Sequence, residues 1–376
     1  YTAQWQEHTY TVAYDANGGT GTTESSTHTY DVPKALNANG FSRVGWTYLG
    51  WSTTPNGSVQ FSNGQEVSNL TGDNGATVTL YAVWSQNDYI YNFLANGGEG
   101  GTSGTLHYGD PVAVPAVTKT GYTFGFWAEG DPPATMPASN ILFTAVWFVH
   151  TYTVTYNGNS ADGGSTADSA HTYDTLKALT ANGFNKTGFS FAGWSTTPGG
   201  AVEYTDSEAV SNLTAEDEGV VTLYAQWSAI DYSFTFDANG GTGGTSGTLH
   251  YGDPVVAPSV TRPGYTFAGW AEGVPPEYMP NENIIYSAVW TRNFYTVTYN
   301  GNGATGGSTA DSSHRYDTAK VLTTNGYTRI GGIFQGWSTT PDGNVQYTNG
   351  QSVLNLTTQP YGTVTLYAVW YLINYD

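Results

Sequence analysis

Histidines are the first candidates for chemistry in this chain, because five of its seven recur just ahead of an aspartate. A metal site needs at least three converging ligands, and each occurrence offers one His with one Asp nearby. We therefore expect these side chains to lie on strands and to face solvent. The five precede Tyr-Asp or Tyr-Gly-Asp and are His28, His107, His171, His250 and His314. The other two, His8 and His150, are expected in linkers.

Carboxylates also recur at fixed places. The sequence Asp-x-Asn-Gly-Gly at residues 15–19 and 237–241 resembles the start of a calcium loop, but the acidic residue that such a loop needs at its far end is missing, and Leu94 replaces the Asp in one copy. Asn-Gly adopts positive φ at low cost, so these residues predict a turn. Glu129 and Glu272 recur in Trp-Ala-Glu-Gly without the second carboxylate that glycoside hydrolysis requires.

No residue of this chain is assigned a catalytic, cofactor-binding or metal-binding role. There is no Cys to act as a nucleophile, and neither Gly-x-Ser-x-Gly nor a phosphate loop occurs. An active site is usually built once, whereas every polar landmark here recurs. We therefore expect a chain that is not an enzyme and that uses no cofactor.

Tryptophans could serve as sugar-stacking platforms, since an indole ring offers a flat apolar face with a polar edge. The alternative is that each small module buries them, because a short chain needs large aromatics to build a core. We favour the core. The Trp residues fall on repeated landmarks, namely Trp5, Trp84, Trp147, Trp227, Trp290 and Trp370 in one motif and Trp51, Trp127, Trp194, Trp270 and Trp337 in another, with Trp46 beside the latter.

Three lysines, Lys34, Lys177 and Lys320, occupy one equivalent position in a chain that is poor in Lys. Some bacterial surface stalks are locked by Lys–Asn isopeptide bonds beside a buried acid. No such triad is evident here, so exposed lysines on short helices are the preferred interpretation.

The composition excludes some partners. The chain has 376 residues with 30 Asp+Glu against 10 Lys+Arg, a net charge of −20. Such a charge repels nucleic acids and anionic membranes. Without Cys, no disulfide contributes to stability. No stretch is apolar for long enough to span a bilayer, and no signal peptide is evident.

Internal repeats position all these residues. Long units that close on Leu-Tyr-Ala-x-Trp alternate with shorter ones, and both ends of the chain are expected to be cut within the pattern of a longer array. We assign residues 1–8 to the end of a preceding short repeat and its linker, 9–84, 148–227 and 291–370 to long repeats, 85–147 and 228–290 to short repeats, and 371–376 to the start of a following repeat.

Each repeat shows local signals for a few elements. Alternation of apolar residues with Thr predicts strands at residues 152–156 and 221–227. In long repeats an N-capping Asp and a later Asn-Gly predict a short helix, from Asp31, Asp174 or Asp317. A motif Gly-x-x-aromatic-x-Gly-Trp follows, and Phe126 replaces its second Gly in one copy.

The three motifs together resemble the Listeria–Bacteroides repeat, also called the internalin B-repeat family, in five tandem copies of alternating long and short type. This resemblance implies small β-grasp, ubiquitin-like modules, hence a mostly β, α+β fold with short helices. It also implies tandem use in large bacterial surface proteins, as spacers or adhesive segments, and it transfers no catalytic residue.

The expected function is that of an extracellular structural stalk, in which the short linkers join the modules into an elongated rod at a prokaryotic cell surface. Its expected partners are neighbouring repeats of the same chain, with no nucleic acid and no membrane insertion. One alternative is an adhesive module that binds glycans or a host protein. Another is a segment of a self-assembling filament, joined by strand addition at open sheet edges.

Overall fold

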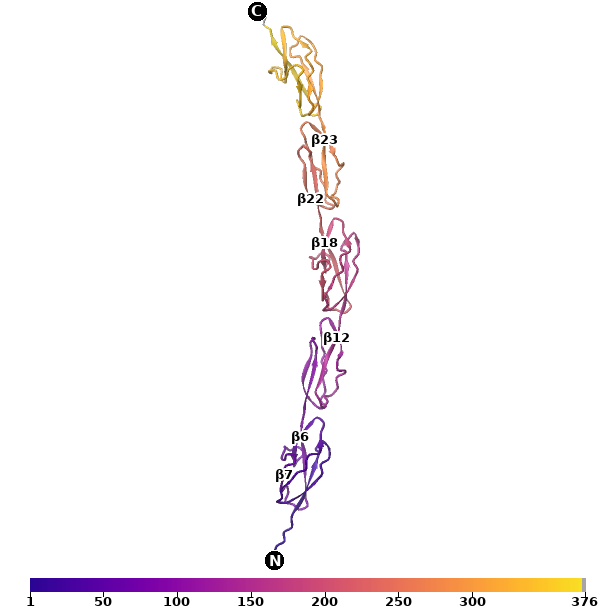
Figure 1. Cartoon of the computed structure of the whole chain (residues 1–376), viewed down its shortest axis with the longest axis vertical. Helices are drawn as coiled ribbons and strands as arrows, with labels where there is room; N and C mark the ends of the chain where they lie inside the picture. Colours follow the sequence, from indigo (N-terminus) through magenta and orange to yellow (C-terminus); the bar gives the residue numbers. More distant parts are fainter. Residues whose placement is uncertain (374–376) are drawn as a thin grey trace. The chain divides into compact units, whose positions relative to one another are not determined.

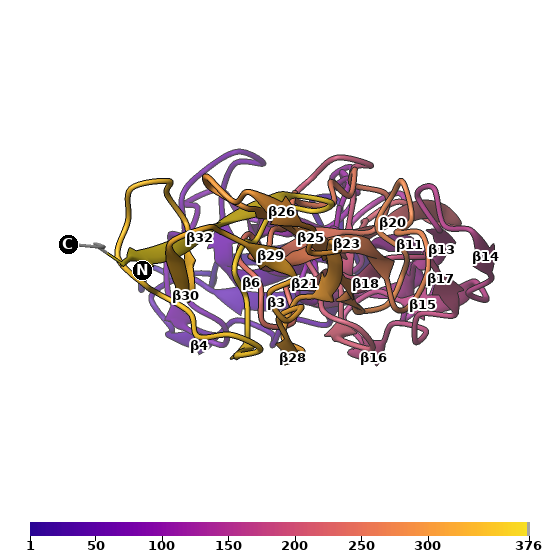
Figure 2. The same ribbon diagram turned by 90° about the horizontal axis from the view of Figure 1, so that it is seen from above.

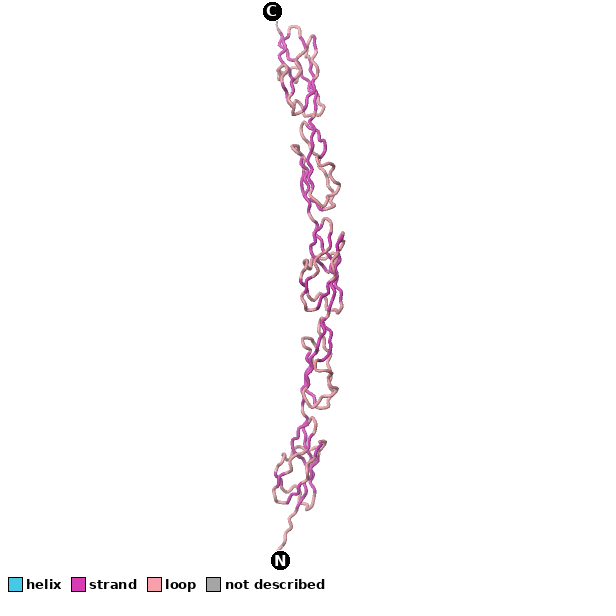
Figure 3. Tube along the Cα trace, turned by 45° about the vertical axis from the view of Figure 1, so that its right-hand side comes forward, coloured by secondary structure: helices cyan, strands magenta, loops and turns pink. Residues whose placement is uncertain are grey.

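The computed structural model describes residues 1–373, and every regular element in this part is a β-strand (Figures 1 and 3). These residues form two compact units, which contain the first two and the last two repeats respectively and share the third. The first unit comprises Tyr1–Tyr156, Ala167–Thr180 and Ser207–Leu223, and the second comprises Asn157–Thr166, Ala181–Asp206 and the chain from Tyr224 onward.

The first repeat is built on a four-stranded sheet in the order β3-β1-β8-β6. The central strands β1 and β8 are parallel, and each pairs with an antiparallel outer strand. Two small ladders, β2 with β5 and β4 with β7, lie outside this sheet. The strands are β1 (Thr9–Asp15), β2 (Thr20–Gly21), β3 (Ser26–Thr29), β4 (Lys34–Ala35), β5 (Phe41–Ser42), β6 (Trp46–Ser52), β7 (Glu66–Val67) and β8 (Thr77–Gln86).

The second repeat, also in the first unit, keeps the same kind of sheet in the order β10-β9-β12-β11 but has no small ladders among its strands. Its central pair, β9 and β12, is again parallel. The strands are β9 (Asp88–Leu94), β10 (Thr102–His107), β11 (Tyr122–Trp127) and β12 (Ile141–Val149).

The third repeat has the strand set of the first. β13 pairs with β15, and β18 pairs with β20, both antiparallel. The strands are β13 (Thr151–Asn157), β14 (Gly163–Gly164), β15 (Ser169–Thr172), β16 (Lys177–Ala178), β17 (Phe184–Asn185), β18 (Phe189–Ser195), β19 (Ala209–Val210) and β20 (Gly219–Ala229).

The second unit repeats both patterns, with sheets β22-β21-β24-β23 and β27-β25-β32-β30. The fourth repeat has β21 (Asp231–Asp237), β22 (Thr245–His250), β23 (Tyr265–Trp270) and β24 (Ile284–Arg292). The fifth has β25 (Phe294–Asn300), β26 (Gly306–Gly307), β27 (Ser312–Arg315), β28 (Lys320–Val321), β29 (Tyr327–Thr328), β30 (Gly332–Ser338), β31 (Ser352–Val353) and β32 (Thr363–Leu372). Residues 374–376, within the segment expected to open a following repeat, lie outside the described part.

One face of each sheet is buried, because apolar residues alternate along its central strands. In the first repeat Tyr10 and Val12 on β1 and Leu80 on β8 point to this face, and Trp51 on β6 packs against them. Leu36, beside β4, and Val67, on β7, belong to the same buried cluster. The core of a long repeat is therefore closed by loops and two-residue ladders.

The expected α+β class is wrong, because no helix occurs among residues 1–373 and the fold of this part is all-β. The β-grasp assignment fails with it, since there is no helix to pack on the sheet. Where helices were expected, the two-residue strands β4, β16 and β28 pair with β7, β19 and β31 (Figure 2 labels the first three).

The residue that was expected to cap the helix explains the difference. An N-cap needs an extended backbone, whereas Asp31 has φ of 65°. Its backbone N–H donates to Oδ1 of Asn69, whose side-chain amide donates back to its carboxylate at 2.7 Å. A helix of one or two turns would also have to meet the cost of nucleation for few hydrogen bonds. Asp174 and Asp317 pair with Asn212 and Asn355 in the same way.

Candidate functional site

The tryptophans of the Gly-Trp motif are core residues in the long repeats. Trp51, Trp194 and Trp337 are fully buried, and Trp127 is nearly so. Trp270 in the fourth repeat is half-buried. These rings therefore do not form a row of exposed platforms for sugars.

The tryptophans of the Leu-Tyr-Ala-x-Trp motif, at the end of each repeat, connect its last long strand to the turn after its first strand by a hydrogen bond. Trp84 is half-buried, and its Nε1–H donates to the carbonyl oxygen of Ala16 at 2.9 Å. Trp147, Trp227, Trp290 and Trp370 make the equivalent bond to Ala95, Gly158, Ala238 and Gly301. Trp5, ahead of the first strand, is exposed, and Trp46 is half-buried beneath the guanidinium of Arg43.

The Asp-x-Asn-Gly-Gly sequence forms a turn, as expected. Asn17 has φ of 48°, and its backbone N–H donates to Oδ1 of Asp15. Its side-chain amide donates to the carbonyl oxygens of Pro55 and Ala82. The Asp and Asn side chains are thus used to hold the turn on strand β8. No group of three or more His, Asp or Glu side chains that could hold a metal ion occurs in the described residues.

The expectation that all five recurring histidines face solvent is wrong for the long repeats. His28, His171 and His314 are buried, and each Nε2 lies within 2.9 Å of a serine Oγ. Burial, with a smaller contribution from Lys34, lowers the pKa of His28 below its usual value. In the short repeats His107 is partly exposed, 3.1 Å from Asp88, and His250 lies at the same distance from Asp231.

Glu129 and the three recurring lysines have structural roles. The carboxylate of Glu129 accepts hydrogen bonds from the backbone N–H and the hydroxyl of Thr144, and the backbone bond is the main cause that lowers its pKa. Glu272 accepts the N–H of Ser287. The lysines are exposed, on strands rather than on the expected helices, and each Nζ donates to a backbone carbonyl oxygen: Lys34 to Thr27, Lys177 to Ala170 and Lys320 to Ser313.

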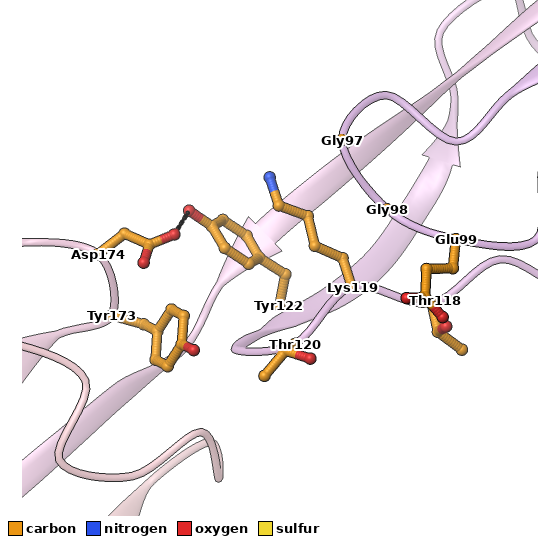
Figure 4. A pocket seen from close by; sticks show the side chains of 9 residues that line it. All are labelled: Gly97, Gly98, Glu99, Thr118, Lys119, Thr120, Tyr122, Tyr173 and Asp174. Carbon is orange, nitrogen blue, oxygen red and sulfur yellow. Dashed lines mark hydrogen bonds between the residues drawn. The ribbon is translucent and has the colours of Figure 1, made fainter.

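The residues that the structure brings together from different repeats lie at the junctions, which sequence reasoning missed. A cleft of about 510 Å³ lies between the second and third repeats (Figure 4). Its volume is in the range of small-molecule sites. Such sites are lined mostly by apolar side chains, whereas this cleft is lined by glycines and by polar and charged residues. It is lined by Gly97, Gly98, Glu99, Thr118, Lys119, Thr120, Tyr122, Tyr173 and Asp174.

Two tyrosines and one aspartate close this junction. The hydroxyl of Tyr122 donates to Oδ2 of Asp174 at 3.0 Å, and this hydrogen bond is the main cause that raises the pKa of Tyr122. The rings of Tyr122 and Tyr173 meet edge to face, and Lys119 Nζ lies 3.9 Å from the centroid of the Tyr122 ring. Tyr173 also covers Gly121, where a Cβ atom would come within 2.2 Å of its ring.

The junction between the fourth and fifth repeats has the same arrangement. Tyr265 donates to Asp317 at 2.6 Å, packs on Tyr316 and lies under Arg262. The hydrogen bond from Tyr265 is the main cause that lowers the pKa of Asp317. The sequence did contain a signal, because Tyr-Asp recurs at residues 30–31, 173–174 and 316–317.

Junctions from a long to a short repeat use a tyrosine and a glycine. Tyr108 lies over Gly45, and Tyr251 lies over Gly188. In both cases the Cβ and ring of the tyrosine occupy the space that a side chain would need if the glycine were replaced. Tyr316 covers Gly264 between the fourth and fifth repeats, so each of the four junctions pairs a glycine of one repeat with a tyrosine of the next.

The linker residues bond to their neighbours as well. His150, the single residue between β12 and β13, has Nε2 2.8 Å from Oγ1 of Thr123 in the preceding repeat. Its Nδ1 lies 2.7 Å from the carbonyl oxygen of Ala215 in the following repeat, so Nδ1 carries the proton. Asn293 links Thr266 to Thr358 in the same manner.

Comparison with known proteins places these repeats in a family. Residues 10–83, 89–145, 152–226, 232–288 and 295–369 each match the model of the Listeria-Bacteroides repeat domain. The chain belongs to the Listeria-Bacteroides repeat family. The resemblance inferred from the motifs, with five tandem copies, is confirmed.

Several curated proteins are similar in sequence to this chain. Two proteins of Evansella cellulosilytica, named "Putative Gly-rich membrane protein" and "Putative membrane protein", are each 26% identical to this chain, over 82% and 78% of it and 37% and 45% of their own lengths. "Internalin H" of Listeria monocytogenes is 27% identical over 58% of this chain and 40% of its own length. The chain thus spans less than half the length of these curated relatives.

One solved structure, described as the Bacillus anthracis TIE protein, aligns with 98% of this chain and 75% of its own, at 8% identity and a TM-score of 0.25. That score is too low to support an argument about the fold. No helix long and apolar enough to span a membrane occurs among residues 1–373.

Proposed function

We propose that this chain is a non-catalytic spacer segment of an extracellular cell-surface protein. The observation that carries the proposal is the junction, where a tyrosine of one repeat covers a glycine of the repeat before it. Linkers of one residue and these side-chain contacts restrict the independent motion of successive repeats, as a spacer requires. The membrane-protein names of two relatives support the cell surface as its location.

The absence of an active site is part of the proposal. Glu129 and Asp174 hold backbone or junction contacts, and the tryptophans of the Gly-Trp motif are buried in the long repeats. These side chains recur because each repeat needs them for its own structure. The partners of a repeat are then its neighbours in the same chain, without a glycan or a host protein.

Paired spin labels test the proposal, since the native chain has no Cys and introduced cysteines would be labelled specifically. We expect labels on the exposed Ser58 in the first repeat and Ser103 in the second to give a narrow distance distribution. Tyr108→Ala, which removes the ring over Gly45, should broaden it. A broad distribution in the parent chain would contradict the spacer. Specific binding of the parent chain on a glycan array would instead support an adhesive module.

A further inference from the structure

The first and last long strands of a repeat are parallel neighbours. In the first repeat β1 and β8 run in one direction, in register from Thr11 opposite Thr77 to Asp15 opposite Tyr81. The pairs β9 with β12, β21 with β24 and β25 with β32 are parallel as well. The chain therefore enters such a ladder at one end and leaves it at the other. A pull on both ends of a repeat slides these two strands along each other.

Tension would pass directly from one parallel ladder to the next, because the linkers between repeats are too short to extend. β8 ends at Gln86, and β9 begins at Asp88. The other linkers, between β12 and β13, β20 and β21, and β24 and β25, are also one residue long. The outer strands β3 and β6 are not part of this path, because the force enters through β1 and leaves through β8.

Side chains tie the two loaded strands together at the far end of the ladder. Just after β1, the carbonyl oxygen of Ala16 accepts the indole N–H of Trp84 on β8, and the amide of Asn17 donates to Ala82 on β8 at 2.8 Å. The same amide bond joins Asn96 to Ala145, Asn159 to Ala225, Asn239 to Ala288 and Asn302 to Ala368. The turn asparagine after the first strand and the Trp that ends each repeat thus connect the same pair of strands.

The near end of the ladder is tied too. The backbone N–H of Gly75 donates to the carbonyl oxygen of Thr9 at 2.7 Å, and the N–H of Thr9 donates to Oδ1 of Asn74. In the third and fifth repeats a hydroxyl bond between threonines, Thr155 with Thr222 and Thr298 with Thr365, adds a further link along the ladder.

We propose that each repeat is a mechanical clamp, in which the parallel ladder of its first and last strands carries tension in shear. This rests on the proposed function, because a spacer at a cell surface is loaded whenever its far end is held or dragged. Sliding requires all hydrogen bonds of the ladder to break together, whereas peeling an antiparallel hairpin breaks them one at a time. Forced unfolding follows the unfolding rate rather than the equilibrium stability, so this geometry decides the strength.

Single-molecule force spectroscopy on the full chain, held at its two ends, tests the clamp. Unfolding should occur in separate high-force events, one for each repeat. Extended chain spans at most about 3.4 Å per residue, so a long repeat should release about 25 nm and a short one about 20 nm. The short repeats should yield at lower force, because their ladders pair four residues and those of the first and fifth repeats pair five.

The pulling direction provides the decisive control. Asp231 and His250 are antiparallel partners at one end of β21 and β22, so force applied through cysteines at these two positions peels the strands apart. We expect the fourth repeat to open at severalfold lower force in this geometry. Equal forces in both geometries would overturn the clamp.

Matched variants test the side-chain hydrogen bonds that connect the two loaded strands. Trp290→Phe keeps a ring but removes the indole N–H, and Asn239→Gly keeps the positive φ but removes the amide. Each should lower the peak force of one short repeat and leave the other unchanged. Val260→Ala, in the same core but outside the ladder, should lower the melting temperature with little change in force. If only Val260→Ala lowered the force, the clamp would be wrong.

The two proposals fail separately. High shear force together with broad spin-label distances would overturn the spacer and leave the clamp intact. Low force together with narrow distances would overturn the clamp alone.

Discussion

The imidazole of His28 stacks on the ring of Tyr10, with the two centroids 5.5 Å apart and the planes inclined by 23°. The same pair recurs as Tyr152 with His171 and Tyr295 with His314. Burial lowers the pKa of each of these histidines. In the short repeats Leu106 and Leu249 stand opposite the equivalent tyrosines.

A pH dependence follows for the long repeats. A histidine whose pKa is lower in the folded chain takes up a proton more readily when unfolded. The stability of the long repeats should therefore be complete above about pH 6.5, the usual His pKa. It should fall as the pH drops from there through the folded pKa. The melting temperature, measured between pH 7.5 and 5, checks this.

The natural short repeats supply the control substitution. His28→Leu, His171→Leu and His314→Leu, made together, should flatten the pH dependence. If the triple variant lost as much stability on acidification as the parent chain, other groups would be responsible.

Glycine at the β-bulge of the Gly-Trp motif, between Phe191 and Gly193 in the third repeat, should be required more strictly in long repeats than in short ones, because only there would a side chain also clash. A Cβ atom at Gly193 would lie 2.5 Å from Cγ1 of Val202, whereas one at Gly269 would meet nothing within 4 Å. Phe126 occupies the equivalent position of the second repeat and is largely exposed. Gly193→Ala should cost about 1–3 kcal/mol, the usual cost of overpacking. Gly269→Ala should cost less, and equal losses in chemical denaturation would contradict this explanation.

The glycine also shows how much of the fold the sequence could predict. The expected strands at residues 152–156 and 221–227 lie within β13 and β20, because alternation is a local signal. The need for Gly193 was not predictable, since it depends on residues 202–204 folding back over the strand, as the bridge from Trp194 to Tyr204 shows.

The wrong expectations have similar causes. Lys34–Ala35 were expected in a helix, but they pair with Glu66–Val67, about thirty residues away. His28 and His107 looked equivalent because each stands three residues before an Asp. They lie one residue apart in the pairing, since His28 stands opposite Tyr10 while Leu106 stands opposite Tyr89. A shift of one residue moves a side chain to the other face of a sheet.

The hydrogen bond from Tyr265 to Asp317 should hold the fourth and fifth repeats together. Tyr265→Phe removes the hydroxyl and keeps the ring on Tyr316. We expect faster amide hydrogen exchange at Tyr316, whose N–H donates to the carbonyl oxygen of Asn293, with little change in the core of either repeat. Tyr278→Phe, at an exposed tyrosine of the fourth repeat, is the matched control.

The same junction should also tolerate mild acid. Because the pKa of Asp317 is lowered in the folded chain, its contribution is complete above the usual Asp pKa of about 4. It is lost only as the pH falls further, through the folded pKa. In the variant with His314→Leu, which removes the buried histidine nearby, a loss of amide protection at Tyr316 already near pH 6 would contradict this role of Asp317.

The last prediction concerns the order in which repeats unfold. The core cluster of the fifth repeat contains eight buried residues, including Trp337. The fourth repeat buries five smaller apolar side chains and leaves Trp270 half-buried; the five are Phe236, Ala238, Val260, Met279 and Ala288. Small domains depend on the apolar surface they bury, so the short repeats should melt first. Calorimetry of the full chain should show a transition at lower temperature for the short repeats and one at higher temperature for the long repeats.

Trp337→Ala, which empties a fully buried site at a cost of about 3–5 kcal/mol, should remove part of the transition at higher temperature and leave the other in place. Trp270→Ala should act on the lower transition and by less. A short repeat that melted above the long ones would show that loops and junctions, rather than the buried core, set the stability of these repeats.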